Sequence, residues 1–421
     1  MDIRKPLQSA LDAAGREEFA QQAFGDAADK VAFIEAVLRF FSYHGRSLQG
    51  VAKKRFGGES EVHLRWLLDT VLEAEPAALV TMSDYYILNA LLYCRDALAD
   101  YRAEEIDRRL DHYRAALLNH REHSTPTNDA LLNVDQWQSE AAQSKGICLI
   151  CPSPYSLYSL VLFELALRLN IPIKSVVIRS FSLQRFKSEF KRDGFRLLKK
   201  IYRKLLLKAD ENADETDLSL KKLSCALPVA FSNIRDYAKK HAVPVYTLSS
   251  FNDFDGSQEH GEAAFFAGGG MIPPSLLDCF QHGVINIHMG ILPQYRGMDV
   301  VESPIMESQL NEVGLSAHFM VEGLDLGPII SRHFISTAPY KSLGELRNEV
   351  GFFMPLRMID AYLGFLSGRY PLEYQQAADG RQYFYVHPSI KGLIDGVLSN
   401  NRQPKGAAEP SFEQMVAQLD F

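Results

Sequence analysis

Hydrophobic positions along the chain follow two different periods, and the change between them divides the sequence. From residue 30 to residue 120, apolar side chains recur every three or four positions, as in helices that pack into a bundle. From residue 146 onward, short β-branched runs alternate with apolar helical stretches, starting with a strand at 147–151, a helix at 157–169 and a strand at 173–178. This order predicts a βαβ unit that feeds a parallel sheet.

The two periods predict an all-helical N-terminal domain followed by an α/β domain, which has a Rossmann-like, mostly parallel sheet with flanking helices. Residues 123–145 are polar and rich in turn formers, which is typical of a linker between domains. The expected division is a helical domain at residues 1–122, a linker at 123–145, the α/β domain at 146–335, a C-terminal helix with short strands at 336–399 and a flexible tail at 400–421.

The segment 283–330 holds the most informative polar residues. A predicted buried strand at 284–288 carries Asn286 and His288 two positions apart, so both side chains project to the same side near its carboxyl end. In open α/β sheets, ligands bind outside the carboxyl ends of the strands. A single strand histidine is usually structural, so neither residue alone indicates a site.

Two more polar residues follow in the same segment. A strand at 316–320 carries His318, and the tight loop after it carries Asp325 in the run Gly-Leu-Asp-Leu-Gly-Pro. Such a loop could return Asp325 to His288, although a Gly-Xaa-Asp loop by itself is usually only a turn. The four residues together suggest an active site.

These motifs together resemble the catalytic domain of the folate-dependent formyltransferases, the family of methionyl-tRNA, glycinamide ribonucleotide and sugar-nucleotide N-formyltransferases. The family pattern is Asn-Xaa-His, Leu-Pro-Xaa-Tyr-Arg-Gly, a histidine strand and Gly-Xaa-Asp-Xaa-Gly-Pro. It stands here at residues 286–288, 292–297, 318 and 323–328, within a resemblance that covers residues 146–335. The chain departs from the pattern at 289–291, where Met-Gly-Ile replaces the common Pro-Ser-Leu, and at 298–302, where relatives often carry small residues and proline.

The resemblance implies transfer of a formyl group from 10-formyltetrahydrofolate to a primary amine, a reaction of one-carbon metabolism. His288 would be the general acid and base, because an imidazole pKa of about 6.5 suits proton transfer at neutral pH. Asn286 would donate an N–H to the developing oxyanion, and Asp325 would orient and stabilise the imidazolium. His318 would support the Asp325 loop. No metal and no covalent enzyme intermediate are expected.

The resemblance also implies where the two substrates bind. After a strand at 262–267, glycines would bring backbone groups close to the pterin of the folate. A carboxylate at 299 or 302 could attract an ammonium group before it loses its proton. The residues expected at the donor are Gly268, Gly269, Gly270, Met271, Ile272 and Gly323, and those expected at the acceptor are Tyr295, Arg296, Asp299 and Glu302.

The favoured acceptor is a small amine such as an amino-sugar nucleotide, because residues 336–421 look too helical for the OB-like C-terminal domain of methionyl-tRNA formyltransferases. Methionyl-tRNA is the disfavoured alternative, supported only by the basic stretch 184–208, and such a run is more often a solvated helix. A 10-formyltetrahydrofolate hydrolase and a non-catalytic folate-binding or interaction module also stay open. The helical domain could serve dimerisation, partner docking or shaping of the acceptor pocket.

Composition narrows the class of protein. The 421 residues are 47% hydrophobic and carry a formal net charge of −7, which suits two or three domains with cores and argues against a dedicated nucleic-acid binder. No apolar signal region opens the chain, and no run approaches the roughly 18 to 20 apolar residues that span a bilayer. We therefore expect a cytoplasmic protein with no membrane contact. The resemblance adds small-molecule partners, and a homodimer stays open.

Two further observations argue against a cysteine metal site and against nicotinamide-dependent chemistry. Cys148 and Cys151 form a Cys-Xaa-Xaa-Cys inside a predicted strand, where positions three apart face opposite sides, so they cannot hold one metal ion without a bend. No Gly-Xaa-Gly-Xaa-Xaa-Gly follows the first strand of the α/β domain, which disfavours a nicotinamide-dependent dehydrogenase.

Overall fold

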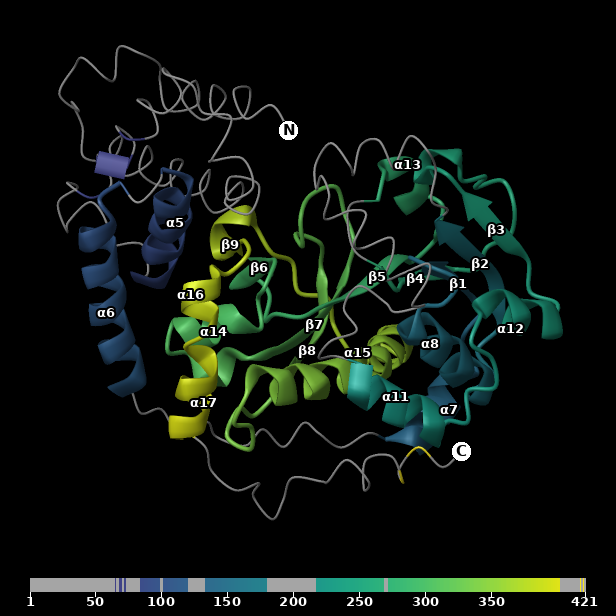
Figure 1. The fold of residues 1–421 in the computed structure, drawn as a ribbon. Coiled ribbons are helices and arrows are strands. Elements are labelled where there is room, and N and C mark those ends of the chain that lie inside the picture. Colours follow the sequence, from purple (N-terminus) through teal and green to yellow (C-terminus); the bar gives the residue numbers. More distant parts are fainter. Residues whose placement is uncertain are drawn as a thin grey trace, which may run out of the picture.

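The computed structural model describes residues 84–98, 101–119, 133–179, 217–268 and 272–401, together with Arg65, Leu68, Asp69, Leu72, Ala417 and Leu419. Four expectations concern residues outside this set: most of the helical domain before residue 84, the basic stretch 184–208, residues 269–271 and most of the tail. The described part is built on a seven-stranded sheet with helices around it (Figure 1).

The sheet has the strand order β3-β2-β1-β4-β5-β7-β8. From β3 to β5 the neighbouring strands are parallel, and β7 and β8 continue the sheet in antiparallel pairings. The bounds are β1 Ile147–Cys151, β2 Ile173–Arg179, β3 Val245–Leu248, β4 Ala263–Phe266, β5 Gly283–His288, β7 Gly314–Phe319 and β8 Ile329–Phe334. The predicted mostly parallel sheet is therefore confirmed.

The two faces of the sheet pack into two separate cores. On β1, Leu149 and Cys151 belong to the larger core, whereas Cys148 and Ile150 belong to the smaller core. This alternation follows from the two-residue period of a strand, and it confirms that the two cysteines face opposite sides. Among the residues that the structure describes, no group of three His, Cys, Asp or Glu side chains could hold a metal ion.

Helix α15 (Leu343–Leu366) supports the larger core. Ser342 caps it by accepting from the Glu345 N–H at 3.2 Å, as expected for a serine before a helix. It packs against α8 (Leu157–Arg168), α11 (Asp217–Ala226), β5 and β7 (Figure 1).

No described helix is long and apolar enough to cross a membrane. The shorter helices are α12 Ile234–Lys240, α13 Pro274–Leu277, α14 Glu302–Met306, α16 Pro388–Lys391 and α17 Ile394–Asn401, with 3₁₀ turns η3 Phe251–Asp253, η4 Leu310–Glu312 and η5 Ala377–Asp379.

The predicted linker contains a helix, so that expectation is wrong for residues 134–141. Helix α7 (Val134–Ala141) begins after Asn133, whose side chain accepts from the Gln136 N–H at 3.0 Å, and it packs against α15. Its buried stripe consists of Val134, Trp137, Glu140 and Ala141. Within residues 134–141, the polar composition that indicated a linker comes from the exposed face of this short helix.

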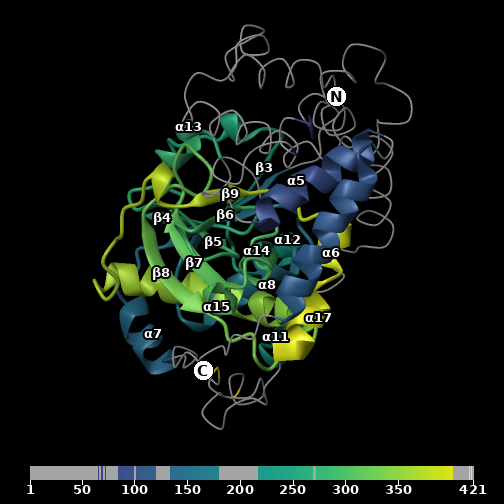
Figure 2. The same ribbon diagram turned by 90° about the vertical axis from the view of Figure 1, so that its left-hand side faces the viewer.

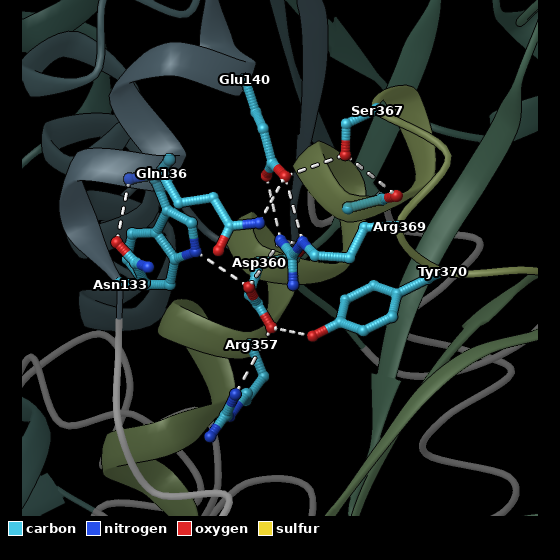
Figure 3. A network of polar contacts seen from close by, with 10 residues as sticks. Asn133, Gln136, Glu140, Arg357, Asp360, Ser367, Arg369 and Tyr370 are labelled. Carbon is cyan, nitrogen blue, oxygen red and sulfur yellow. Dashed lines mark hydrogen bonds and ion pairs between the residues drawn. The ribbon is translucent and has the colours of Figure 1, made fainter.

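A buried polar network joins α7 to α15 (Figure 3). Asp360 of α15 accepts from Trp137 Nε1 at 2.8 Å and from the Tyr370 hydroxyl at 2.8 Å. Arg369 donates to Asp360 Oδ1 at 3.0 Å and to both carboxylate oxygens of Glu140, at 3.0 Å and 2.9 Å. The network therefore ties the helix of the supposed linker to the core of the α/β domain.

We expect Asp360→Ala to lower the free energy of unfolding by roughly 3–5 kcal/mol at pH 7, because Arg369 and Arg357 would lose a carboxylate that is 5% exposed. Burial acts to raise the pKa of Asp360, but Arg357 and Arg369 outweigh it and lower that pKa. The stabilisation is thus present above the unfolded-state pKa of about 3.9 and is lost as pH falls through the lower folded-state pKa.

Urea unfolding between pH 7 and pH 3 measures this effect, and the difference between wild type and Asp360→Ala should shrink as the pH falls. Asp135→Ala, on the exposed face of α7, is the control and should change stability by no more than about 0.5 kcal/mol. A difference that stayed constant over the whole pH range would contradict the charged role of Asp360.

The helical pattern of the N-terminal part is confirmed for α5 (Asp84–Ala97) and α6 (Ala103–Asn119). Both helices pack on the C-terminal part of the chain, next to β9 and α17 (Figures 1 and 2). Asn89 of α5, 4% exposed, donates to the Tyr385 carbonyl at 3.1 Å and accepts from the His387 N–H at 2.7 Å. Tyr113 of α6 donates to the Met306 carbonyl at 2.6 Å. Beside α5, β6 (Tyr295–Gly297) pairs with β9 (Arg381–Tyr383).

Candidate active site

The carboxyl end of β5 is the centre of a cluster of four polar side chains. The pairing of β5 with β7 places Asn286 opposite His318, and Asn286 Nδ2 lies 3.3 Å from His318 Nε2. The loop after β7 returns Asp325 to the same place, with Oδ2 3.5 Å from His288 Nδ1 and Oδ1 3.7 Å from His318 Nε2. The structure therefore brings together Asn286, His288, His318 and Asp325, called the β5–β7 cluster below.

His288 is 6% exposed, and its tautomer follows from its neighbours. Its Nε2 lies 2.8 Å from the carbonyl oxygen of Tyr295, which can only accept, so Nε2 carries the proton of the neutral ring. Nδ1 then presents a lone pair to the Asp325 carboxylate. Because two acceptors face each other there, the position between them suits a proton, an ammonium group or a water molecule that donates to both.

His318 orients the amide of Asn286. Its Nδ1 lies 2.9 Å from the Phe319 carbonyl oxygen, so Nδ1 donates and Nε2 accepts from the amide. Burial lowers the pKa of His318 to about 4, although the carboxylate of Asp325 acts to raise it, so the ring is neutral at pH 7. One N–H of Asn286 is engaged by His318, and no described residue accepts from the other.

Asp325 occupies a strained backbone position. Its φ is 54°, which is uncommon for a residue other than glycine and persists only where surrounding contacts hold it. The N–H of Gly297 donates to Asp325 Oδ2 at 3.1 Å, so β6 helps to fix the carboxylate. The Gly297 contact holds the Asp325 carboxylate in place beside His288.

Gln375 also holds this loop, and nothing in its sequence context singled it out. Its Nε2 donates to the carbonyl oxygens of Asp325 at 3.0 Å and Gly327 at 2.7 Å. Its Oε1 is buried without a hydrogen-bond partner in the described part of the chain, which is unfavourable for stability. Both observations indicate that Gln375 serves the loop through its two N–H donors. Gln375 lies 50 residues from Asp325 in the sequence.

We expect Gln375→Met to lower kcat/KM of the reaction at this site by roughly 10- to 100-fold, because a small displacement of Asp325 is enough to misalign the cluster. Steady-state kinetics measures this effect. The same substitution should have little further effect in an Asp325→Ala background, and an equal loss in that background would show that Gln375 does not act through Asp325.

The two carboxylates expected to attract an acceptor amine are part of buried ion pairs instead. Glu302 is 0% exposed and pairs with Arg347 and with Lys391 Nζ at 2.8 Å. Asp299 accepts from the Val386 N–H at 3.0 Å and lies 3.6 Å from Arg347 Nη2. The expectation of direct acceptor contact is therefore wrong for Glu302, whose charge holds α14 to α15 and α16. Arg347 and Lys391 lie too far from Glu302 along the chain for the sequence pattern to reveal these ion pairs.

The other two expected acceptor residues line a pocket of about 820 Å³ next to the cluster. Tyr295 is one wall, and Leu324 and Leu326 border the pocket on both sides of Asp325. Arg296 is 4% exposed and donates to the carbonyl oxygen of Gln376 at 3.1 Å, and to those of residues 377 and 380. Arg296 thus shapes a wall of the pocket by holding the loop 376–380.

Of the residues expected at the folate donor, the structure describes Gly268, Ile272 and Gly323. Gly268 follows β4, where a Cβ would lie 3.3 Å from the Phe266 ring and 3.6 Å from Pro152 at the end of β1. Ile272 is 6% exposed and packs in the smaller core, and Gly323 has a φ of 127° that favours glycine. A side chain at Gly268 would thus crowd the Phe266 ring, and contact of these three residues with the folate donor stays a prediction.

Known proteins resemble parts of this chain. A family model described as formyl transferase matches residues 263–361. A methionyl-tRNA formyltransferase of Staphylococcus epidermidis is 31% identical over 124 residues, which are 28% of this chain and 40% of the relative. A methionyl-tRNA formyltransferase of Brucella abortus is 30% identical over 174 residues, which are 40% of this chain and 56% of the relative. The chain thus matches about half the length of these relatives.

Among solved structures, an N-formyltransferase from Helicobacter canadensis in complex with folinic acid and dTDP-3-aminofucose has a TM-score of 0.36 and 12% identity, over 61% of this chain and 80% of that chain. At this score the similarity says nothing about the acceptor. The family model, in contrast, covers β4, β5, β7, β8 and most of α15, and it contains the whole β5–β7 cluster. Residues 263–361 of the chain are therefore similar to the formyl transferase family, and this stretch carries the candidate site.

Proposed function

We propose that this chain transfers a formyl group from 10-formyltetrahydrofolate to the primary amine of a small acceptor, with an amino-sugar nucleotide as the favoured class. The observation that carries the proposal is the separation of 3.5 Å between His288 Nδ1 and Asp325 Oδ2, with the amide of Asn286 beside them. The match of residues 263–361 to the formyl transferase family model supports the donor. A pocket of about 820 Å³ supports a small acceptor, since pockets of this size hold small molecules.

The cluster supplies what the attack of an amine requires. His288 Nδ1 accepts the proton of the attacking amine while Nε2–H stays bonded to the Tyr295 carbonyl, and the Asp325 carboxylate stabilises the imidazolium that forms. The same proton then passes from His288 to the departing nitrogen of the donor. Asn286 donates its second N–H to the formyl oxygen as negative charge develops there, and the neutral ring of His318 keeps that amide oriented.

The test is mass spectrometry of a panel of acceptors incubated with the protein and 10-formyltetrahydrofolate. The panel contains nucleotide-linked amino sugars, simple primary amines and methionyl-tRNA. A gain of one formyl group on a small amine is the expected result. Release of formate with no formylated acceptor would replace the proposal with a hydrolase, and an unchanged donor in every sample would replace it with a non-catalytic folate-binding module.

Methionyl-tRNA is the second candidate acceptor, and the relatives favour it, because both of those named above are methionyl-tRNA formyltransferases. The matches span 40% and 56% of their lengths, so the similarity does not extend over their whole chains. Formylated methionyl-tRNA as the sole product in the same panel would establish this candidate and contradict the small-molecule acceptor.

A further inference from the structure

Three side chains in one row across the sheet hold the loop between β5 and β6, called the β5–β6 loop below. The pairing of β5 with β7 places His288 opposite Ser316, and the pairing of β7 with β8 places Ser316 opposite Arg332. Residues opposite each other on neighbouring strands project to the same face of a sheet, so these three side chains share one face. The three strands lie side by side (Figure 1). The row therefore links the candidate active site on β5 to β8 at the end of the sheet.

Each member of the row binds the backbone of the β5–β6 loop or of β6. Ser316 Oγ accepts from the Leu292 N–H at 2.9 Å, and Arg332 Nε donates to the Leu292 carbonyl oxygen at 2.6 Å. His288 Nε2 donates to the carbonyl oxygen of Tyr295, where β6 begins, at 2.8 Å. Leu292 and Ser316 are 0% exposed, so solvent does not replace a donor that is lost there. The position of the Tyr295 carbonyl, which selects the tautomer of His288, thus depends on how Arg332 holds Leu292.

The same guanidinium also holds the chain segment that supports Asp325. Nη1 and Nη2 of Arg332 donate to the two carboxylate oxygens of Glu373, at 2.6 Å and 2.5 Å. Backbone hydrogen bonds of 2.8 Å and 2.9 Å join Glu373 to Ile329 at the start of β8. Two residues further on, Gln375 donates to the Asp325 carbonyl oxygen at 3.0 Å. Arg332 therefore lies between the supports of both halves of the β5–β7 cluster.

The charge of the ion pair does not explain this arrangement. The side chains of Arg332 and Glu373 are 24% and 54% exposed, and an ion pair near the surface contributes little to stability. The geometry of the guanidinium is what distinguishes the contact. Its three nitrogens are held in one plane and all three are engaged, so they set the distance between the β5–β6 loop and the segment at Glu373.

We propose that Arg332 is a positioning residue, which fixes the backbone on both sides of the β5–β7 cluster and so keeps His288 and Asp325 aligned with each other. The geometric role stands on the contacts above, and its effect on the rate rests on the formyl transfer proposed for this chain. The sequence around Arg332 did not indicate this role, because Leu292 lies 40 residues before it and Glu373 lies 41 residues after it.

NMR of the full chain, labelled with ¹⁵N at the histidine rings, tests the proposal without any substrate. In wild type, His288 is held in one tautomer, so the signals of its protonated Nε2 and its bare Nδ1 should lie far apart. In Arg332→Gln, the β5–β6 loop loses its donor at Leu292 and the Tyr295 carbonyl no longer selects one tautomer. The two tautomers then interconvert, and the separation of the signals should shrink. The His288 signals are identified by their absence from the spectrum of His288→Ala.

Single-turnover kinetics with 10-formyltetrahydrofolate and a nucleotide-linked amino sugar measures the effect on the reaction. Arg332→Gln should lower kcat by roughly 10- to 100-fold, because a small misplacement of the reacting groups is enough. The KM for the amino sugar should not change, since Arg332 does not line the pocket. Arg332→Lys keeps the positive charge and guards against a misfolded variant. It should show both the NMR effect and the loss of kcat, because one ammonium group does not replace three fixed donors.

Arg168→Gln is the matched control, because Arg168 also joins a carboxylate to a backbone carbonyl. It donates from Nε to Glu164 at 2.9 Å and from Nη2 to the Leu227 carbonyl oxygen at 3.1 Å, and its side chain is 27% exposed. Arg168 lies in the last turn of α8, outside the row. In urea unfolding it should lose about as much stability as Arg332→Gln, but its His288 signals and its kcat should match those of wild type.

A wild-type separation of the His288 signals in both Arg332 variants would overturn the proposal. A loss of kcat in Arg332→Gln no larger than the loss in Arg168→Gln would overturn it as well. A narrowed separation in the Arg332 variants, combined with no formylated product even from wild type, would support the positioning role and contradict the proposed formyl transfer.

Discussion

His288→Ala should lower kcat for formyl transfer by about 10²- to 10⁴-fold, because it removes the group that accepts the proton of the attacking amine. In the structure, Nδ1 is the nitrogen that faces Asp325 with a lone pair, since Nε2 donates to the Tyr295 carbonyl. The KM for the acceptor should change much less, because the pocket walls are contributed by other residues.

Single-turnover assays with 10-formyltetrahydrofolate measure this loss without a contribution from product release. His112→Ala provides a matched control, because His112 lies on the exposed face of α6 and should leave the rate unchanged. A full wild-type rate in His288→Ala would show that proton transfer takes place elsewhere.

Asp325→Asn should also lower kcat by about 10²- to 10⁴-fold, although the side chain keeps its size. A neutral amide does not stabilise an imidazolium. If the amide nitrogen faces His288, its N–H donates to the Nδ1 lone pair and blocks the base. If the amide nitrogen turns the other way, the oxygen still accepts from the Gly297 N–H, but the negative charge is gone.

Single-turnover kinetics measures the loss in Asp325→Asn. Asp278→Asn, exposed at the end of α13, serves as the control and should behave like wild type. A rate within tenfold of wild type would rule out a proton-transfer role for Asp325.

The two substitutions should not be additive. Because Asp325 acts through the protonated ring of His288, its charge has no effect once the imidazole is removed. The double variant should therefore be about as slow as His288→Ala alone. Rates that multiply would show that the two side chains act independently, despite the 3.5 Å between them.

Local periodicity was sufficient to predict much of the fold from the sequence. Alternation along residues 284–288 placed Asn286 and His288 on one side of a strand, and β5 has this arrangement. The same alternation separated Cys148 from Cys151, which lie in different cores. Composition was misleading at α7, because a short helix with a narrow buried stripe is mostly polar, as a linker is.

The identities of the cluster residues were readable from the sequence because they lie in one segment with recognisable spacing. Their chemical states were not, since these depend on atoms that approach through folding. The Tyr295 carbonyl decides the tautomer of His288, and burial decides that His318 is neutral. Glu302 is another example, because only its contacts with Arg347 and Lys391 show that its carboxylate is structural.

The sequence by itself determined which residues could carry out the chemistry and on which side of a strand each would lie, because strand and helix periods are local. Only the tertiary structure decided what surrounds those residues. Gln375 reaches Asp325 across 50 residues, and Asn89 reaches His387 across 298. Contacts over such separations arise from the packing of whole elements, so they leave no periodic pattern in the chain.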